Sequence, residues 1–122
     1  MAVNPKPGEL TLTPRTPQDP VDAKDFHRRG NLRSRNGSYE SAIADYSKAI
    51  EMDLDFAEAH YDRGSSFYEL GRYEESLADL NRAIDLDAND ARYYRQRSLV
   101  YLFTDRIDLA QADEEMCEEL RN

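Results

Sequence analysis

The stretches NGSYESAIADYSKAIEMD (36–53) and LGRYEESLADLNRAIDLD (70–87) decide the fold, because they repeat one pattern 34 residues apart. Gly, Tyr, Ala-Asp, Ala-Ile and a closing Asp fall at matching places in both. Apolar residues recur at helical spacing, and each Gly stands where a helix commonly stops. A helix pair of this period buries its apolar face only when copies stack. The sequence therefore predicts stacked repeats.

Helix signals continue along the rest of the chain and predict an all-α fold. Asp19 before Pro20 fits a helix cap, and Asp55 with Glu58 three residues later fits a capping box. No segment reads as a strand. We expect one domain over residues 19–122, made of three helix–turn–helix units at about 23–56, 57–90 and 91–122, with six to seven helices.

Composition limits the classes of function. All five prolines precede residue 21, so residues 1–18 are expected to form a flexible Pro-rich leader. A net charge of −9 argues against binding of nucleic acid. No apolar run is long enough to cross a membrane, so we expect no membrane insertion. Cys117 is the single cysteine, which favours a reducing, cytoplasmic location.

The three units resemble tetratricopeptide repeats, and the resemblance covers everything after the leader. Gly30 and Gly64 stand at the small position of the first helix, and Ala42, Ala49 and Ala83 at small positions of the second. The closing Pro of the family pattern is absent. The resemblance implies a right-handed solenoid whose first helices line a concave groove and whose second helices form the convex back. Such a groove binds a segment of another protein.

Six charged residues recur in phase, one Arg and one Asp in each unit. They are Arg29, Arg63 and Arg97 in the first helices and Asp45, Asp79 and Asp113 in the second. We interpret them as a ladder of partly buried ion pairs that join helix to helix. The alternative is a row of arginines that binds a ligand. The sequence leaves open which Asp pairs with which Arg.

The resemblance also assigns residues to the groove, one set from each unit. The predicted groove residues are His27, Arg28, Asn31, Arg35, Tyr61, Ser65, Tyr68, Arg92, Arg95, Gln96, Leu99, Leu102 and Phe103. The first helices carry charges of +4, −2 and +2 (residues 23–37, 57–71 and 91–105), whereas each second-helix segment carries −4. The predicted ligand is therefore a peptide or helix with acidic residues and a large apolar side chain.

Relatives that bind chaperones hold the terminal carboxylate of a partner with five polar residues. The matching positions here are His27, Asn31, Asp62, Arg92 and Gln96. Asp62 places an acid where the relatives use an amide, so this carboxylate clamp is degenerate.

No catalytic arrangement is visible. His27 and His60 lie in different units, and neither has a second ligand at metal-binding spacing. Cys117 stands where the other units have Ala, which favours a small buried side chain. We therefore expect no enzyme activity, cofactor or metal. The favoured function is a protein-binding adaptor. The alternatives are an assembly subunit that self-associates through its stack ends and, less favoured, a co-chaperone.

Overall fold

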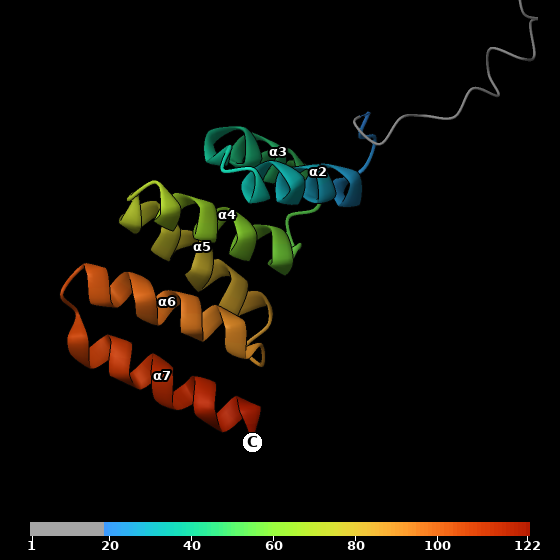
Figure 1. The fold of residues 1–122 in the computed structure, drawn as a ribbon. Coiled ribbons are helices and arrows are strands. Elements are labelled where there is room, and N and C mark those ends of the chain that lie inside the picture. The colour runs from blue at the N-terminus through green and yellow to red at the C-terminus, as the bar shows by residue number, and fades with distance from the viewer. Residues whose placement is uncertain (1–18) are drawn as a thin grey trace, which may run out of the picture.

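Residues 19–122 of the computed structural model form six helices, stacked as three pairs (Figure 1). The pairs are α2 (Ala23–Arg35) with α3 (Tyr39–Met52), α4 (Ala57–Glu69) with α5 (Tyr73–Leu86), and α6 (Ala91–Phe103) with α7 (Ile107–Arg121). This range contains no strand. The predicted all-α helical-repeat fold is confirmed. The structure describes residues 19–122, so the predicted leader over 1–18 lies outside the described residues.

Each helix pair is closed by a short turn that needs a residue with positive φ. Gly37 (φ 79°) and Gly71 (φ 75°) supply it in the first two pairs. Asp105 (φ 60°) takes this role in the third pair. Glycine adopts this conformation freely, and Asp is among the few other residues that tolerate it. The third turn therefore keeps the geometry of the first two although its glycine is missing.

Two predicted helix starts are wrong. Helix α2 begins at Ala23, and Asp22, not Asp19, caps it by accepting from the Asp25 backbone N–H at 2.9 Å. Helix α4 has Phe56 at its N-cap and no side-chain cap, so the Asp55–Glu58 capping box does not form. Phe56 packs instead against a buried apolar cluster that includes Ala49 and Ala59. Burial of the ring therefore sets this boundary, not polar capping.

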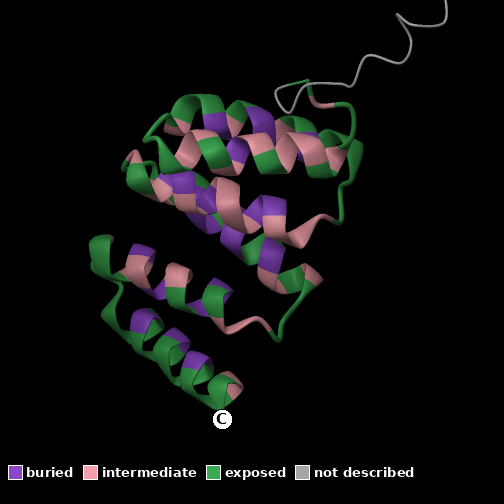
Figure 2. Ribbon diagram, turned by 45° about the vertical axis from the view of Figure 1, so that its right-hand side comes forward, coloured by how far each residue is buried: buried purple, intermediate pink, exposed green. Residues whose placement is uncertain are grey.

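Small residues bring the paired helices close together. A Cβ added to Gly30 would lie 2.6 Å from a ring carbon of Tyr46, and one added to Gly64 would lie 3.2 Å from Leu80 Cγ. The aromatic ring of Tyr46 thus occupies the space that a side chain at position 30 would need. Buried residues follow the faces between neighbouring helices, whereas the outer side of α7 is exposed (Figure 2).

The length and apolar character of the helices bear on whether any of them could cross a membrane. Among the helices of residues 19–122, none combines the length and the apolar character that crossing a membrane would require.

Candidate functional site

Each repeat contains a buried ion pair between its two helices, and in the first repeat Arg33 adds a further contact, 3.1 Å from Asp45 Oδ2. Arg29 donates to both carboxylate oxygens of Asp45 at 3.0 and 2.8 Å, Arg63 to those of Asp79 at 2.7 Å each, and Arg97 to those of Asp113 at 2.8 and 2.7 Å. The three carboxylates are only 4–6% exposed. Every Arg therefore pairs with the Asp of its own repeat, in the two-pronged geometry that suits guanidinium and carboxylate.

Two of these arginines also reach the preceding repeat. Arg63 Nη1 donates to Ser47 Oγ at 3.0 Å, and Arg97 Nη1 donates to Asn81 Oδ1 at 2.9 Å. Ser47 and Asn81 occupy equivalent positions on α3 and α5, 34 residues apart. The guanidiniums of Arg63 and Arg97 thus link three helices each. Because their donors are used within the stack, they are poorly placed to receive a ligand.

A polar pocket of about 300 Å³ lies where the first helices meet. Its walls come from all three repeats: Asn31, Ser34 and Arg35 of α2, Tyr46 of α3, Glu58, Asp62 and Ser65 of α4, and Arg92 of α6. The pocket therefore brings together four predicted groove residues, Asn31, Arg35, Ser65 and Arg92, while His27 contacts Asp62 of its wall. It holds both signs of charge.

The five clamp positions are mostly engaged with other groups of the protein. His27 Nε2 lies 2.5 Å from Asp62 Oδ2, and Asn31 Oδ1 accepts from the Tyr46 hydroxyl at 2.7 Å. Arg92 donates to Glu58 at 2.5 Å and to Asp90 at 2.6 Å. These carboxylates hold the pKa of Arg92 well above its usual value. A terminal carboxylate would have to compete with these bonds.

The other two basic groove residues on α2 are exposed. Arg28 contacts Asp25 at 3.5 Å, with 72% of its side chain exposed. Arg35 lines the pocket and makes no ion pair within residues 19–122. Gln96 of α6 differs from these exposed arginines, because its Nε2 atom is buried and has no hydrogen-bond partner within residues 19–122. Arg35 thus leaves donors available in the groove, whereas the Gln96 donor is enclosed within the stack.

Other predicted groove residues lie at the contacts between repeats. Tyr61 lies against Tyr93, with ring centroids 5.0 Å apart, and burial raises the pKa of its hydroxyl. Tyr68 meets Phe103 edge-on at 5.6 Å. Phe103 is nevertheless 63% exposed and Leu102 47%, whereas Leu99 is half-buried. Arg95 lines a different pocket, at the end of the stack.

Sequence reasoning missed two contributors to the groove. Tyr46 comes from a second helix, and its hydroxyl reaches the groove because Gly30 leaves room for the ring. Asp90 caps α6 and fixes Arg92. The sequence signal for Tyr46 was a large aromatic side chain at the position that packs against the small residue Gly30.

One group of potential metal ligands occurs in the described residues. Oxygen or nitrogen atoms of His27, Glu58 and Asp62 lie within 4.8 Å of one another. His27 and Asp62 already bond to each other, and Arg92 neutralises Glu58. These contacts account for the cluster without an ion.

The stacked helix pairs, the in-phase ion pairs and the polar groove define a helical-repeat protein of the solenoid class. The chain belongs to the tetratricopeptide repeat family, whose sequence model matches residues 27–91. Comparison with curated proteins finds no match.

Solved structures of this family superimpose closely. The second TPR of Spaghetti (RPAP3), bound to the HSP90 peptide SRMEEVD, is 28% identical with a TM-score of 0.80, covering 85% of this chain and 96% of that one. The first TPR of Spaghetti, bound to the same peptide, is 24% identical with a TM-score of 0.80, covering 81% and 79%. The Arabidopsis OM64 TPR domain is 21% identical with a TM-score of 0.79, covering 80% and 81%.

Proposed function

We propose that this chain is a protein-interaction adaptor that holds a segment of a partner protein in the groove of α2, α4 and α6. The polar pocket shared by all three repeats carries the proposal. Arg35 lines this pocket and makes no ion pair within residues 19–122. A bound peptide would supply carbonyl or carboxylate oxygens to Arg35.

A relative with bound peptide supports this proposal. The second TPR of Spaghetti is seen with the acidic peptide SRMEEVD. Peptide binding by a similar stack makes the same use of this groove reasonable. We further propose a cytoplasmic adaptor or scaffold without enzyme activity, whose ligand has acidic residues near Arg28 and Arg35 and an apolar side chain near Leu99 and Phe103.

The groove proposal is tested with two matched charge reversals. Arg35→Glu changes the pocket, whereas Arg82→Glu makes the same change on an exposed residue of α5, whose only ion pair within residues 19–122 is a 3.5 Å contact with Asp55. Tagged wild-type and variant proteins are used to purify partners for mass spectrometry. We expect Arg35→Glu to lose partners that Arg82→Glu retains. The reverse result would place binding on the convex back and sink the groove proposal.

The co-chaperone alternative depends on Asp62. This carboxylate would repel the terminal carboxylate of a partner and already holds His27. We predict that SRMEEVD with a free C-terminus binds no better than its C-terminal amide, because the clamp is occupied. Asp62→Asn should raise affinity for the free acid by about fivefold, since removing one nearby charge changes the energy by about 1 kcal/mol even in water. Fluorescence anisotropy of labelled peptides measures both. Tight, carboxylate-dependent binding by the wild-type protein would restore the co-chaperone alternative.

The assembly alternative makes a different prediction about size. A subunit that self-associates through its stack ends would change mass with concentration in size-exclusion chromatography with light scattering. The adaptor proposal expects a constant monomer mass.

A further inference from the structure

Helix α6 docks onto the second repeat through contacts at both ends of the helix. Near its start, Tyr93 is 2% exposed and lies against Tyr61. Burial raises the pKa of the Tyr93 hydroxyl, and the nearby carboxylates of Glu58 and Asp87 raise it further. Ten residues later, Phe103 lies 5.6 Å from Tyr68 and 5.9 Å from Tyr73, measured between ring centroids. Two sockets on the second repeat therefore hold α6.

The middle of α6 makes two further contacts with the second repeat. Arg97 donates to Asn81, and Val100 packs in a buried cluster with Leu77 and Leu80. The residues of α6 that face the second repeat are therefore Tyr93, Arg97, Val100 and Phe103.

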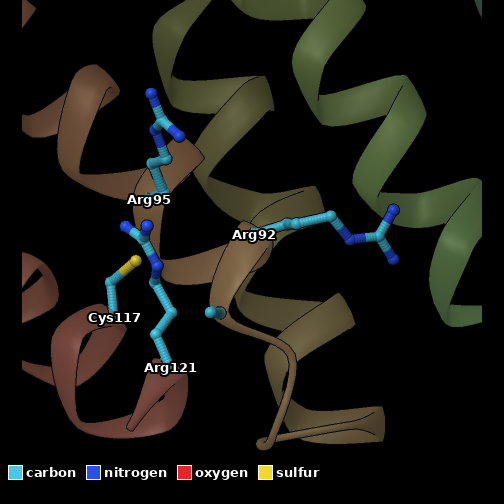
Figure 3. Close-up of a pocket in the computed structure, with 5 residues that line it drawn as sticks. Arg92, Arg95, Cys117 and Arg121 are labelled. Atoms are coloured by element: carbon cyan, nitrogen blue, oxygen red, sulfur yellow. The ribbon is translucent and has the colours of Figure 1, made fainter.

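The third repeat carries the same sockets, 34 residues on, at the open end of the stack. Where the second repeat has Glu58, Tyr61, Ala83 and Asp87, the third has Arg92, Arg95, Cys117 and Arg121. With Ala91 they line a pocket of about 280 Å³ (Figure 3). At the second socket, Leu102 and Ile107 stand where the second repeat has Tyr68 and Tyr73. They are 47% and 52% exposed. We call these two sites the arginine socket and the apolar socket.

The arginine socket has unbalanced positive charge. Arg95 makes no ion pair within the described part of the chain, and Arg121 makes only a 3.7 Å contact with Glu118. Figure 3 shows the Arg95 and Arg121 side chains near Cys117, while Arg92 extends away toward α4. The chain as a whole carries −9, so two adjacent guanidiniums without close carboxylates are unusual here. Such a site favours an anionic group.

The surface between the sockets has the opposite charge. Leu77, Leu80 and Asn81 of the second repeat correspond to Gln111, Glu114 and Glu115 of the third. Glu114 and Glu115 are exposed. A helix lying here as α6 lies on the second repeat would face carboxylates with its middle residues. Basic or polar side chains suit this part of the surface.

We propose that the open end formed by α6 and α7 binds one α-helix of a partner protein. Counting from the position of Tyr93, that helix has an acidic residue first and a basic residue four positions later. A basic or polar residue follows at seven positions and a large apolar residue at ten. Ten residues of helix span about 15 Å, the separation at which α6 itself fills the two equivalent sockets. Arg92 lines both the arginine socket and the polar pocket of the groove, but Arg95, Cys117 and Arg121 do not line the polar pocket.

A second copy of this chain fits the surface less well. Its α2 would offer Asp25 and Arg29 at the first two positions, which match. It would then place Leu32 opposite Glu114 and Arg35 opposite the apolar socket, which do not match. Charge and apolar character together therefore favour a helix of a different protein.

The proposal is tested with a designed alanine-rich helical peptide as probe. The peptide carries glutamate, then lysine at four and at seven residues later, and phenylalanine at ten. Its control has the same composition with glutamate and phenylalanine exchanged. Titration into the full ¹⁵N-labelled chain should shift the amide signals of Arg95, Cys117, Arg121, Leu102 and Ile107 and leave Asn31 and Ser65 unchanged. The control peptide should bind at least about tenfold more weakly.

A charge-reversal variant that a charge-reversed probe rescues distinguishes lost recognition from misfolding. The double variant Arg95→Glu/Arg121→Glu should lose about tenfold in affinity and regain it with a probe whose glutamate is replaced by lysine. Arg82→Glu, on the convex back, should bind the original probe like the wild type. The proposal is overturned if the probe gives no saturable shift, shifts groove residues instead, or binds the double variant equally. Self-association of the chain that shifts the same signals would also overturn it. Loss of groove binding in Arg35→Glu would leave these results unchanged.

Discussion

At the scale of single residues, the buried carboxylates make the stack sensitive to the loss of their arginine partners. Asp79 is 6% exposed and is held by two bonds of 2.7 Å from Arg63. An exposed ion pair contributes little to stability, but removing one partner of a buried pair leaves a charge in a low-dielectric site. The ladder is therefore more sensitive to loss of one partner than to loss of both.

We predict that Arg63→Leu lowers the free energy of unfolding by about 3–5 kcal/mol, because Asp79 stays buried with no partner in residues 19–122 closer than His60 Nδ1, 3.7 Å away. Urea unfolding followed by circular dichroism measures the change. Arg82→Leu, an exposed arginine on α5, should change stability by less than about 0.5 kcal/mol. The double variant Arg63→Leu/Asp79→Leu should be more stable than Arg63→Leu alone. A cost near zero for Arg63→Leu would mean that this guanidinium is free to bind ligands.

A second residue-scale prediction concerns Gly30. Its missing Cβ leaves room for the ring of Tyr46, which is 1% exposed and cannot move outward without losing its burial. Gly30→Ala gains up to about 1 kcal/mol of helix propensity, but we expect overpacking to outweigh this and destabilise the fold by about 1–3 kcal/mol.

Gly64→Ala is the comparison for that prediction, since its nearest contacts would be 3.2 Å instead of 2.6 Å. Thermal unfolding of both variants measures the two losses, and the loss for Gly64→Ala should be the smaller. Equal or greater damage at Gly64 would contradict the account of close approach at Gly30.

At the scale of elements, the sequence predicts helices better than it predicts their ends. The positions of Gly37 and Gly71 give the turns, because positive φ strongly favours glycine. Capping competes with packing, so the polar signals at Asp19 and Asp55 were misleading: Phe56 takes the N-cap position to bury its ring.

The sequence likewise predicts only part of the contacts in and around the groove. In-phase repetition identifies the ladder residues, since each pair lies within one repeat. The contact between His27 and Asp62 joins two repeats, 35 residues apart, and has no counterpart elsewhere in the chain that could reveal it. Only the structure therefore shows that two of the clamp positions, His27 and Asp62, are occupied by each other.

The stability that the N-cap residue Asp90 gives to α6 should depend on pH. Asp90 caps α6 by accepting from the Arg92 backbone N–H at 3.0 Å, and hydrogen bonding from the Arg92 side chain holds its pKa below the usual range. We expect Asp90→Ala to cost about 1 kcal/mol at neutral pH. Because the folded-state pKa is lowered, this contribution is present above the unfolded pKa of about 4 and disappears as the pH falls through the folded value.

Unfolding of wild type and Asp90→Ala between neutral and strongly acidic pH checks this prediction. Their difference in stability should shrink to the acid side of about pH 4. Asp55→Ala is the control, because Asp55 is 80% exposed and caps no helix. A difference that is constant with pH would show that the Asp90 carboxylate is not the source of the effect.

At the scale of the whole molecule, the three repeats are joined by apolar clusters and by polar contacts, among them two hydrogen bonds donated by ladder arginines. Ser47 and Asn81 accept the bonds that Arg63 and Arg97 donate across the repeat boundaries. In a linear stack each repeat contacts only its neighbours, so cooperativity depends on these boundaries. The same guanidiniums also clamp helix to helix within a repeat, and this ties repeat stability to coupling between repeats.

We predict that Ser47→Ala and Asn81→Ala each lower stability by about 1 kcal/mol, the usual net worth of one hydrogen bond. The double variant should also unfold less cooperatively, because each boundary loses one of its polar contacts. Calorimetry measures this as a van't Hoff enthalpy that falls below the calorimetric enthalpy, whereas the two should agree in the wild type. Lys48→Ala, next to Ser47 but exposed, is the control. If the double variant unfolds as sharply as the wild type, the buried clusters around Ala49 and Leu80 couple the repeats without help from the ladder.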